Sequence, residues 1–273
     1  MKPRKRSKRK PTVPQRMLHW FLGLSALLVV VMVTMCFLLH SGIVQTLAYY
    51  TGKCSLPTAE VMGVDVSHHQ GKIEWDKVCF NFNSRRILTA QFDTTNLSRP
   101  IDFAFAKATE GETMRDWRYE YNQEGIRKQQ IRFGAYHFFS YTADPARQAR
   151  NFMSFANLQS GDLPPVLDVE GDPDSPVMHV RHSILTWLRI VEAHYGCKPI
   201  VYTYNSFYKK YFEDQSDFAD YVFWIARYPY PPSVGHTLWQ CSDRGRLIGC
   251  PLHHVDINIF NGTREDFDKL RIP

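Results

Sequence analysis

The sequence predicts an α/β protein built as an incomplete (β/α) barrel and preceded by one transmembrane helix. Three features predict it: eight short apolar segments, long amphipathic spacers between several of them, and one uninterrupted apolar stretch near the N-terminus. Strands buried on both faces of a sheet show such continuous apolar runs. The predicted strands lie at residues 61–67, 101–107, 133–139, 165–170, 199–204, 221–227, 237–241 and 254–260.

The spacers between the strands indicate how the strands are connected. Residues 116–130, 144–159 and 178–196 place charges between apolar positions at helical spacing. Parallel strands need a crossover of about a dozen residues or more, which these spacers provide. The gaps 228–236 and 242–253 are short or contain Pro and Gly, so loops are expected there and antiparallel pairing becomes possible.

The N-terminus joins a basic tail to an apolar stretch. Residues 1–16 carry eight basic side chains and no acidic one, and Leu18 to Leu39 contains no Asp, Glu, Lys or Arg. At about 1.5 Å per residue such a helix crosses a hydrocarbon core of about 30 Å. Basic residues stay on the cytoplasmic side. We therefore expect a cytoplasmic tail over 1–16 and a signal-anchor helix over 17–40 in the cytoplasmic (inner) membrane.

The remaining segments are then a tether over 41–59 and a globular domain over 60–273 outside the membrane, periplasmic or extracellular. A cleaved signal peptide is the alternative, but its apolar region spans only about 7–15 residues. Without the tail, the chain has 25 basic and 27 acidic residues, a net charge of −2. This balance argues against binding to nucleic acid. We expect the protein to be a monomer.

Five of the six cysteines lie in the part expected to face an oxidising compartment. Cys241 and Cys250 flank a segment that is typical of a turn between two strands, which makes them the favoured disulfide pair. Pairing of Cys79 with Cys197, or of Cys54 with either, stays open because connectivity does not follow from sequence.

The segment 165–172 carries the strongest functional signal, because Asp168 and Glu170 follow a short apolar run. Side chains two apart on a strand share a face, so these carboxyls should project together, with Leu167 and Val169 on the other side. Mutual repulsion and desolvation raise the pKa of one carboxyl of such a pair. A proton donor beside a carboxylate is the arrangement that glycosidic bond cleavage needs.

Other polar and aromatic residues fall near the C-terminal ends of predicted strands, where active residues of (β/α) barrels lie. Aromatic faces stack on sugars, and carboxylates bind hydroxyls, so this rim predicts a carbohydrate site. The residues are Asp65, Glu110, His137, Asp168, Glu170, Tyr202, Tyr204 and Asp256.

All of these residues except Tyr202 and Tyr204 belong to motifs that resemble the glycoside hydrolase family 25 lysozymes, the Chalaropsis-type N-acetylmuramidases. The resemblance spans about residues 61–262, although 79–100 is longer and more polar than the family's usual connection. The motifs, in the family's order, are Gly63-Val64-Asp65-Val66-Ser67, Phe103-Ala104-Phe105-Ala106-Lys107-Ala108-Thr109-Glu110-Gly111, Gly134-Ala135-Tyr136-His137-Phe138, Leu167-Asp168-Val169-Glu170, Trp224-Ile225-Ala226-Arg227-Tyr228, Trp239-Gln240 and Val255-Asp256-Ile257-Asn258.

The resemblance implies an irregular TIM-like barrel of five β/α units closed by three further strands. It also implies cleavage of the β-1,4 bond between N-acetylmuramic acid and N-acetylglucosamine in peptidoglycan. Glu170 is then the proton donor and Asp168 its charged neighbour, acting as nucleophile or as orienter of the substrate's N-acetyl group. Asp65 and Asp256 match the two further acids of the pocket.

The implied substrate-binding residues are Tyr136 and Lys107, to which we add Tyr202, Trp224 and Glu110. Trp224 could instead fill the core, and Lys107 could pair with Glu110 rather than with substrate.

No cofactor or metal is expected: His68-His69 and His253-His254 are adjacent pairs without a third ligand at zinc-site spacing. Two alternatives remain: a catalytically silent barrel that binds cell wall, and a glycosidase acting on chitin-like N-acetylglucosamine polymers.

Overall fold

The computed structural model describes residues 13–40, 42–91 and 93–273, and the chain divides into two units at Thr51. The first unit contains helices α1 (Val13–His40) and α2 (Ile43–Tyr50). Within α1, Met17–Leu39 is the one span in the described part of the chain that is long and apolar enough to cross a membrane. Most of the predicted basic tail, residues 1–12, lies outside the described residues, and α2 falls within the predicted tether.

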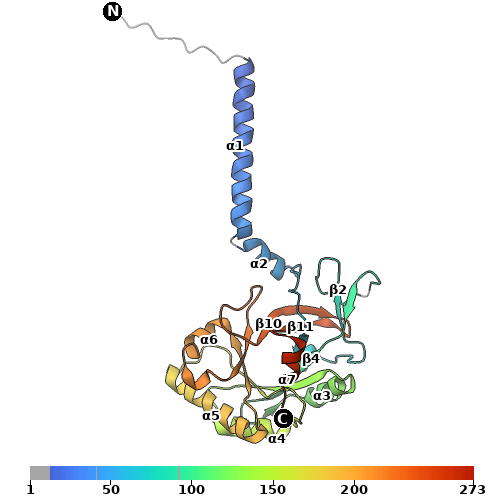
Figure 1. Ribbon diagram of the computed structural model, residues 1–273, viewed down its shortest axis with the longest axis vertical. Helices are drawn as coiled ribbons and strands as arrows, with labels where there is room; N and C mark the ends of the chain where they lie inside the picture. Colours follow the sequence, from blue (N-terminus) through green and yellow to red (C-terminus); the bar gives the residue numbers. More distant parts are fainter. Residues whose placement is uncertain (1–12, 41, 92) are drawn as a thin grey trace, which may run out of the picture. The chain divides into compact units, whose positions relative to one another are not determined.

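The second unit is a closed eight-stranded barrel (Figure 1). Seven strands follow one another in parallel around the barrel, and the eighth, β11, runs antiparallel to both β10 and β1 and closes it. The predicted fold class is therefore confirmed. The strands are β1 (Met62–Val66), β4 (Phe103–Glu110), β6 (Arg132–Phe138), β7 (Val166–Asp168), β8 (Ile200–Tyr204), β9 (Val222–Ala226), β10 (Leu238–Leu247) and β11 (Cys250–Phe260).

The four connections that run from β4 through to β9 carry helices on the outside of the barrel, and the three predicted helical spacers are confirmed (Figure 1). Helix α4 begins where Asp144 accepts a hydrogen bond from the Arg147 amide at 2.8 Å, and α5 ends at Gly196 in the left-handed conformation. The helices are α3 (Tyr119–Lys128), α4 (Pro145–Phe155), α5 (Val177–Tyr195), α6 (Asn205–Tyr211), α7 (Arg264–Lys269) and the 3-10 turn η2 (Ser216–Phe218).

The first connection departs from the β/α pattern. Between β1 and β4 the described residues form no α-helix, only the 3-10 turn η1 (His68–Gln70) and a separate two-stranded sheet of β2 (Phe80–Phe82) and β3 (Leu97–Arg99). This small sheet lies in the segment 79–100 that is unusually long and polar. A further short strand, β5 (Met114–Arg115), pairs with the end of β4.

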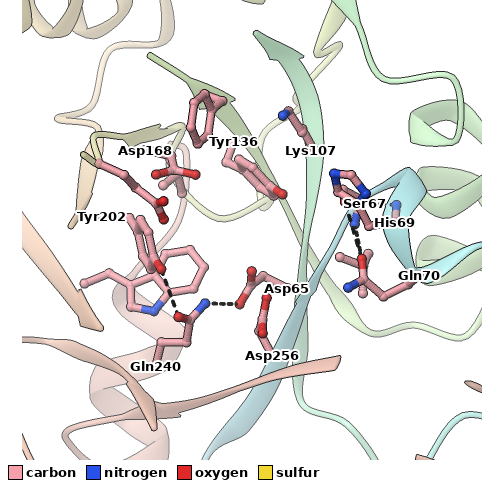
Figure 2. A pocket seen from close by; sticks show the side chains of 15 residues that line it. Asp65, Ser67, His69, Gln70, Lys107, Tyr136, Asp168, Tyr202, Gln240 and Asp256 are labelled. Carbon is pink, nitrogen blue, oxygen red and sulfur yellow. Dashed lines mark hydrogen bonds between the residues drawn. The ribbon is translucent and has the colours of Figure 1, made fainter. Parts of the chain in front are cut away.

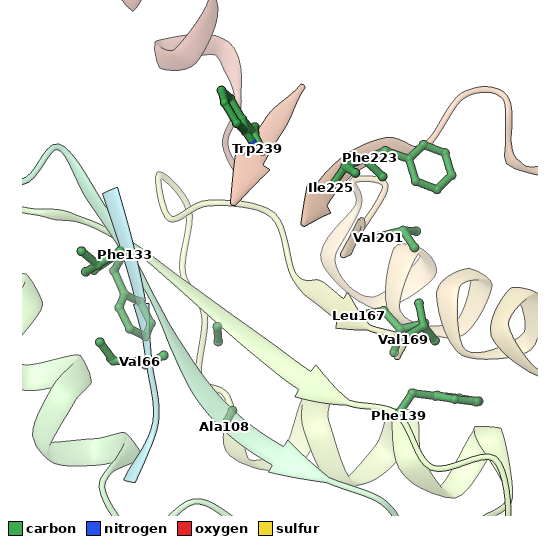
Figure 3. Close-up of a cluster of buried hydrophobic side chains, with 14 of the residues drawn as sticks. Val66, Ala108, Phe133, Phe139, Leu167, Val169, Val201, Phe223, Ile225 and Trp239 are labelled. Carbon is green, nitrogen blue, oxygen red and sulfur yellow. The ribbon is translucent and has the colours of Figure 1, made fainter. Parts of the chain in front are cut away.

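Side chains of the barrel strands alternate between two apolar layers. On β4, Phe103 and Phe105 belong to the cluster inside the barrel, while Ala104, Ala106 and Ala108 belong to the layer beneath the helices. Figure 3 shows part of the outer layer, with Leu167, Val169, Val201 and Ile225. By the same alternation the next inward position on β4 is Lys107, at the C-terminal mouth of the barrel.

The structure corrects two expectations about the last strands. Residues 242–253 are not a loop, because β10 and β11 continue as a hairpin that turns at Ile248 and Gly249, where φ of Gly249 is +83°. Consequently the predicted Cys241–Cys250 disulfide is wrong. Cys250 is opposite Leu247 at the tip of the hairpin, whereas Cys241 is next to Ser242, which is opposite Ile257. The two cysteines therefore lie at different levels of the hairpin and do not face each other. All described cysteines are free thiols.

Candidate active site

A cavity of about 210 Å³ opens at the C-terminal mouth of the barrel (Figure 2). Its wall contains four carboxyl groups, those of Asp65, Asp168, Glu170 and Asp256, and one ammonium group, that of Lys107. These side chains come from four different strands, β1, β4, β7 and β11, or from the residues that directly follow them, so the closed barrel is what brings them together.

The Asp168–Glu170 pair lies in the cavity as the strand alternation predicts. Leu167 and Val169 point into the outer core, and both carboxyls line the cavity. Asp168 is only 8% exposed, and its Oδ1 atom is buried with no hydrogen-bond partner in the structure. Burial, followed by the charge of Glu170, holds the pKa of Asp168 well above its usual range. Burial also raises the pKa of Glu170, so the pair retains a proton where ordinary carboxyls are ionised.

Asp65 and Asp256 form a second acidic pair. They are opposite each other in the antiparallel ladder of β1 and β11, and their side chains are hydrogen-bonded. Burial raises the pKa of both, and the neighbouring charge of Asp65 holds the pKa of Asp256 well above its usual range. The two carboxyls therefore retain a proton between them at a pH where ordinary carboxyls are ionised.

Two buried amides hold the Asp65 carboxylate in place. Its Oδ2 atom accepts hydrogen bonds from Gln240 Nε2 at 2.9 Å and from Asn258 Nδ2 at 2.7 Å. The amide oxygens are used as well: Gln240 Oε1 accepts from Tyr202 Oη at 2.8 Å, and Asn258 Oδ1 accepts from Trp224 Nε1 at 2.9 Å. Figure 2 shows the bonds from Tyr202 through Gln240 to Asp65.

These amides were not predicted as site residues. Asn258 could have been found, because it is two positions from Asp256 on a strand and must share its face. Gln240 follows Trp239 in a two-residue motif that contains no acidic residue, so nothing near it in the sequence marks it as a site residue. Its place becomes evident only when β10 lies beside β11 in the barrel.

The predicted substrate-binding residues divide into two groups. Tyr136, Tyr202, Trp224 and Lys107 line the cavity. Glu110 is not among the residues of the wall, but its Oε2 atom lies 2.6 Å from Lys107 Nζ. Lys107 therefore both pairs with Glu110 and lines the cavity, so the two interpretations of Lys107 are compatible.

Two rim residues are placed differently from the prediction. His137 is fully buried on the outer face of β6, where its ring contacts Thr109 Oγ1 at 2.7 Å and Gln148 Oε1 at 3.2 Å. Because Tyr136 points inward, alternation turns His137 away from the mouth, so its assignment to the rim is wrong. Tyr204, which shares the face of Tyr202, is 38% exposed and lies outside the cavity wall.

A further part of the wall comes from the segment after β1: Ser67, His69 and Gln70 line the cavity opposite Tyr202 and Gln240 (Figure 2). Ser67 caps the turn η1, with its Oγ atom accepting from the His69 amide at 3.2 Å and its amide donating to Gln70 Oε1 at 2.8 Å. The capping pattern of Ser followed three residues later by Gln is readable in the sequence and could have located this turn.

A barrel mouth that holds two carboxyl pairs beside tyrosine and tryptophan side chains defines a carbohydrate-cleaving class of enzyme. Residues 64–250 match the family model for glycosyl hydrolases family 25, and the chain belongs to that family. The matched range ends before Asp256 and Asn258, which the structure nevertheless places at the mouth of the same barrel.

Relatives and solved structures agree with this assignment. The chain is 35% identical over 210 residues to the uncharacterized protein YegX of Escherichia coli, covering 76% of this chain and 71% of that protein. It is 31% identical over 223 residues to lysozyme M1 of Streptomyces globisporus, covering 76% and 69%. A family 25 glycosyl hydrolase from Bacillus anthracis superposes with a TM-score of 0.65 at 30% identity, covering 77% of this chain and 93% of that one.

The bacterial lysozyme from Streptomyces coelicolor superposes with a TM-score of 0.64 at 29% identity, covering 78% and 98%. The chain is thus a glycoside hydrolase of the lysozyme type, and peptidoglycan is its class of substrate.

Proposed function

We propose that the enzyme cleaves the β-1,4 bond between N-acetylmuramic acid and N-acetylglucosamine in peptidoglycan, with Glu170 as general acid. The observation that supports this most strongly is the Asp168–Glu170 pair, whose carboxyls face one cavity and have raised pKa values. A carboxylic acid that keeps its proton near neutral pH can donate it to a leaving glycosidic oxygen.

Glu170 rather than Asp168 holds the shared proton when substrate is bound. Glu170 is the more exposed of the two, and a proton donor must reach the glycosidic oxygen. Asp168 lies deeper in the wall and is only 8% exposed, so it is the less accessible proton donor. Two coupled carboxyls titrate as a pair, so the bound sugar decides which one carries the proton.

The reaction then proceeds in two steps. Glu170 protonates the leaving oxygen of N-acetylglucosamine while the bond to the anomeric carbon of N-acetylmuramic acid breaks. The acetamido oxygen of the latter sugar attacks that carbon, with Asp168 orienting the acetamido group and balancing its developing positive charge. Water next attacks the anomeric carbon, gives a proton to the Glu170 carboxylate and displaces the acetamido oxygen, which restores the acetamido group. Two inversions at one carbon give retention of configuration.

The rest of the cavity positions the sugar. Asp65, held by Gln240 and Asn258, presents an acceptor for hydroxyl or amide protons of the substrate. Tyr136 and Tyr202 supply hydroxyls in the wall. Trp224 is only 2% exposed and stacks on Phe105, so it supports the wall from the core side. Glu110 holds Lys107 in position across 2.6 Å.

The apolar span in α1 supports an anchored arrangement. In this proposal residues 17–40 anchor the chain in the cytoplasmic membrane with the N-terminus inside. Residues 41–59 then connect the anchor to the catalytic domain, residues 60–273, which faces the cell wall. Protease treatment of intact spheroplasts should remove the catalytic domain and leave a membrane-bound N-terminal fragment. Full protection of the catalytic domain would contradict this orientation.

Product analysis tests the bond that is cleaved. Purified peptidoglycan is digested with the full chain in detergent, and the fragments are sized by mass spectrometry after borohydride reduction. We expect reduced N-acetylmuramic acid at the new ends. Reduced N-acetylglucosamine would instead indicate cleavage of the other bond. Turnover of N-acetylglucosamine oligomers alone would indicate a chitin-type glycosidase, and binding without any product would indicate a silent wall-binding barrel.

The substitution Lys107→Met should move the pH profile of turnover to higher pH. The charge of Lys107 lowers the pKa of both Asp168 and Glu170, so its removal raises both. The acidic and alkaline limits of kcat therefore rise together. The measurement is kcat from pH 4 to 9 on solubilised peptidoglycan, with Glu110→Gln as a control that keeps the ammonium group. A profile displaced to lower pH, or left in place, would contradict the assignment of the Asp168–Glu170 pair as the titrating groups.

A further inference from the structure

An exposed tryptophan lies just outside the cavity. Trp117 follows β5 and is 66% exposed. Among the described residues of the barrel unit, it is the one aromatic side chain that is more than half exposed. The other tryptophans of this unit are nearly buried, at 5% or less for Trp75, Trp187 and Trp224 and 7% for Trp239. An exposed ring of this size can stack on a flat ligand, and tryptophan is enriched among the residues that carry binding energy.

The Trp117 ring is connected to the cavity by two imidazoles. Its centroid is 5.9 Å from that of His68, and the His68 and His69 centroids are 4.0 Å apart. His69 is itself part of the cavity wall. Trp117, His68 and His69 thus form a continuous row of rings, here called the ring row, that leads from the cavity onto the outer surface.

One buried carboxylate holds the ring row in place. Asp116 Oδ2 accepts a hydrogen bond from the His68 amide at 3.0 Å and lies 2.6 Å from His68 Nδ1. Its Oδ1 atom accepts from the Arg118 amide at 2.9 Å, and its own amide donates to Ala108 O at 2.9 Å. The backbone on both sides of Trp117 is therefore tied to β4 and to η1, so a ligand need not order this surface on binding.

The cavity is too small to hold more than a short part of a polymer. At about 210 Å³ it is smaller than the pockets of about 300–1,000 Å³ that hold drug-sized ligands. A glycan strand whose scissile bond lies between Asp168 and Glu170 must continue outside the cavity. The ring row provides an aromatic path for that continuation, beside the wall formed by η1.

We propose that the ring row is a sugar-stacking surface that binds the glycan strand beyond the cavity, with Trp117 as its outermost contact. This inference rests on the proposed function, because it takes peptidoglycan glycan as the ligand. Trp117 touches no reacting atom in this assignment; it increases affinity for the polymer and leaves the chemical step unchanged. The Arg118 guanidinium lies over one face of the indole, with its Cζ atom 4.4 Å from the ring centroid. The side of the ring that remains exposed stacks on a pyranose ring, and Arg118 and His68 supply polar groups beside it.

The test separates binding from turnover. In a Glu170→Gln background, the full chain in detergent is sedimented with insoluble peptidoglycan, with and without Trp117→Ala. We expect Trp117→Ala to weaken binding about threefold to tenfold, the range for loss of one aromatic stacking contact. Trp117→Tyr should restore most of the affinity, and Trp117→Leu should not, because only tyrosine keeps a flat ring. Leu97→Ala, which truncates a side chain that is 62% exposed on β3, is the matched control.

Several results would overturn the inference. They are an unchanged affinity of Trp117→Ala, full rescue by leucine, or a loss seen with intact peptidoglycan but not with glycan strands freed of their stem peptides. In the active enzyme, Trp117→Ala should raise KM for the polymer and leave kcat within about twofold. If the unmodified chain shows no turnover, the proposed function fails, but the sedimentation assay still decides whether Trp117 binds glycan.

Discussion

Replacing Glu170 by Gln is expected to reduce kcat on peptidoglycan by about a hundredfold to ten-thousandfold, the usual contribution of a general acid. Glutamine has nearly the same size and can occupy the same place in the wall, but it has no carboxylic proton to give to the leaving oxygen. The measurement is the rate of release of reducing ends, with the melting temperature as a check on folding. The fold should survive, because Glu170 is only partly buried and lies beyond the end of β7.

The matched control for Glu170→Gln is Asp172→Asn. Asp172 lies two residues further along the same loop, and its side chain is 85% exposed and paired with Lys210. Loss of this surface ion pair should leave kcat and the melting temperature nearly unchanged, because exposed ion pairs contribute little to stability. Undiminished turnover in Glu170→Gln would remove Glu170 as the acid, and an equal loss in both variants would point to a disturbed loop instead.

Much of the fold was predictable because local patterns and the fold agree. All eight strands carry runs of apolar residues, and the barrel buries both of their faces. The helices α3, α4 and α5 repeat apolar residues at helical spacing on the side that packs on the strands. The predictions that were wrong concern segments whose structure is decided by strand pairing rather than by the spacing of apolar residues. Residues 242–253 contain charged side chains and glycines, yet become strand because β10 and β11 pair with each other.

The candidate site was predictable to the extent that strand alternation decides which way a side chain points. Alternation placed Asp168 with Glu170 and Tyr202 apart from Thr203, whose hydroxyl donates to Val169 O on the outer side. It also explains why the His137 side chain points away from the rim, since its neighbour Tyr136 points inward. Gln240 and the ring row could not be found in this way, because both depend on contacts between residues far apart in sequence. Gln240 binds Asp65, which is 175 residues away. Trp117 lies beside His68, which is 49 residues away.

The substitution Asp168→Asn should separate catalysis from stability, because it is expected to lower one and raise the other. Loss of the carboxylate that orients the acetamido group and balances positive charge should reduce kcat on the order of a hundredfold or more, as removal of one electrostatic stabiliser does. Glu170 also loses the charged neighbour that opposes its ionisation. The residual activity should therefore decline at lower pH than in the unmodified enzyme.

Stability should change in the opposite direction. Burial raises the folded-state pKa of Asp168 above its unfolded value, so ionisation costs the native state increasingly as pH rises through the ordinary pKa of Asp, about 3.9. Asn carries no such cost, and the melting temperature of Asp168→Asn should exceed that of the unmodified chain at neutral pH. The difference should vanish below pH 4, where the aspartic acid is protonated in both states. A variant that loses activity and stability together at pH 7 would show instead that Asp168 supports the fold. If the ionised Asp168 carboxylate destabilises the folded state, replacing it by a neutral side chain must increase stability.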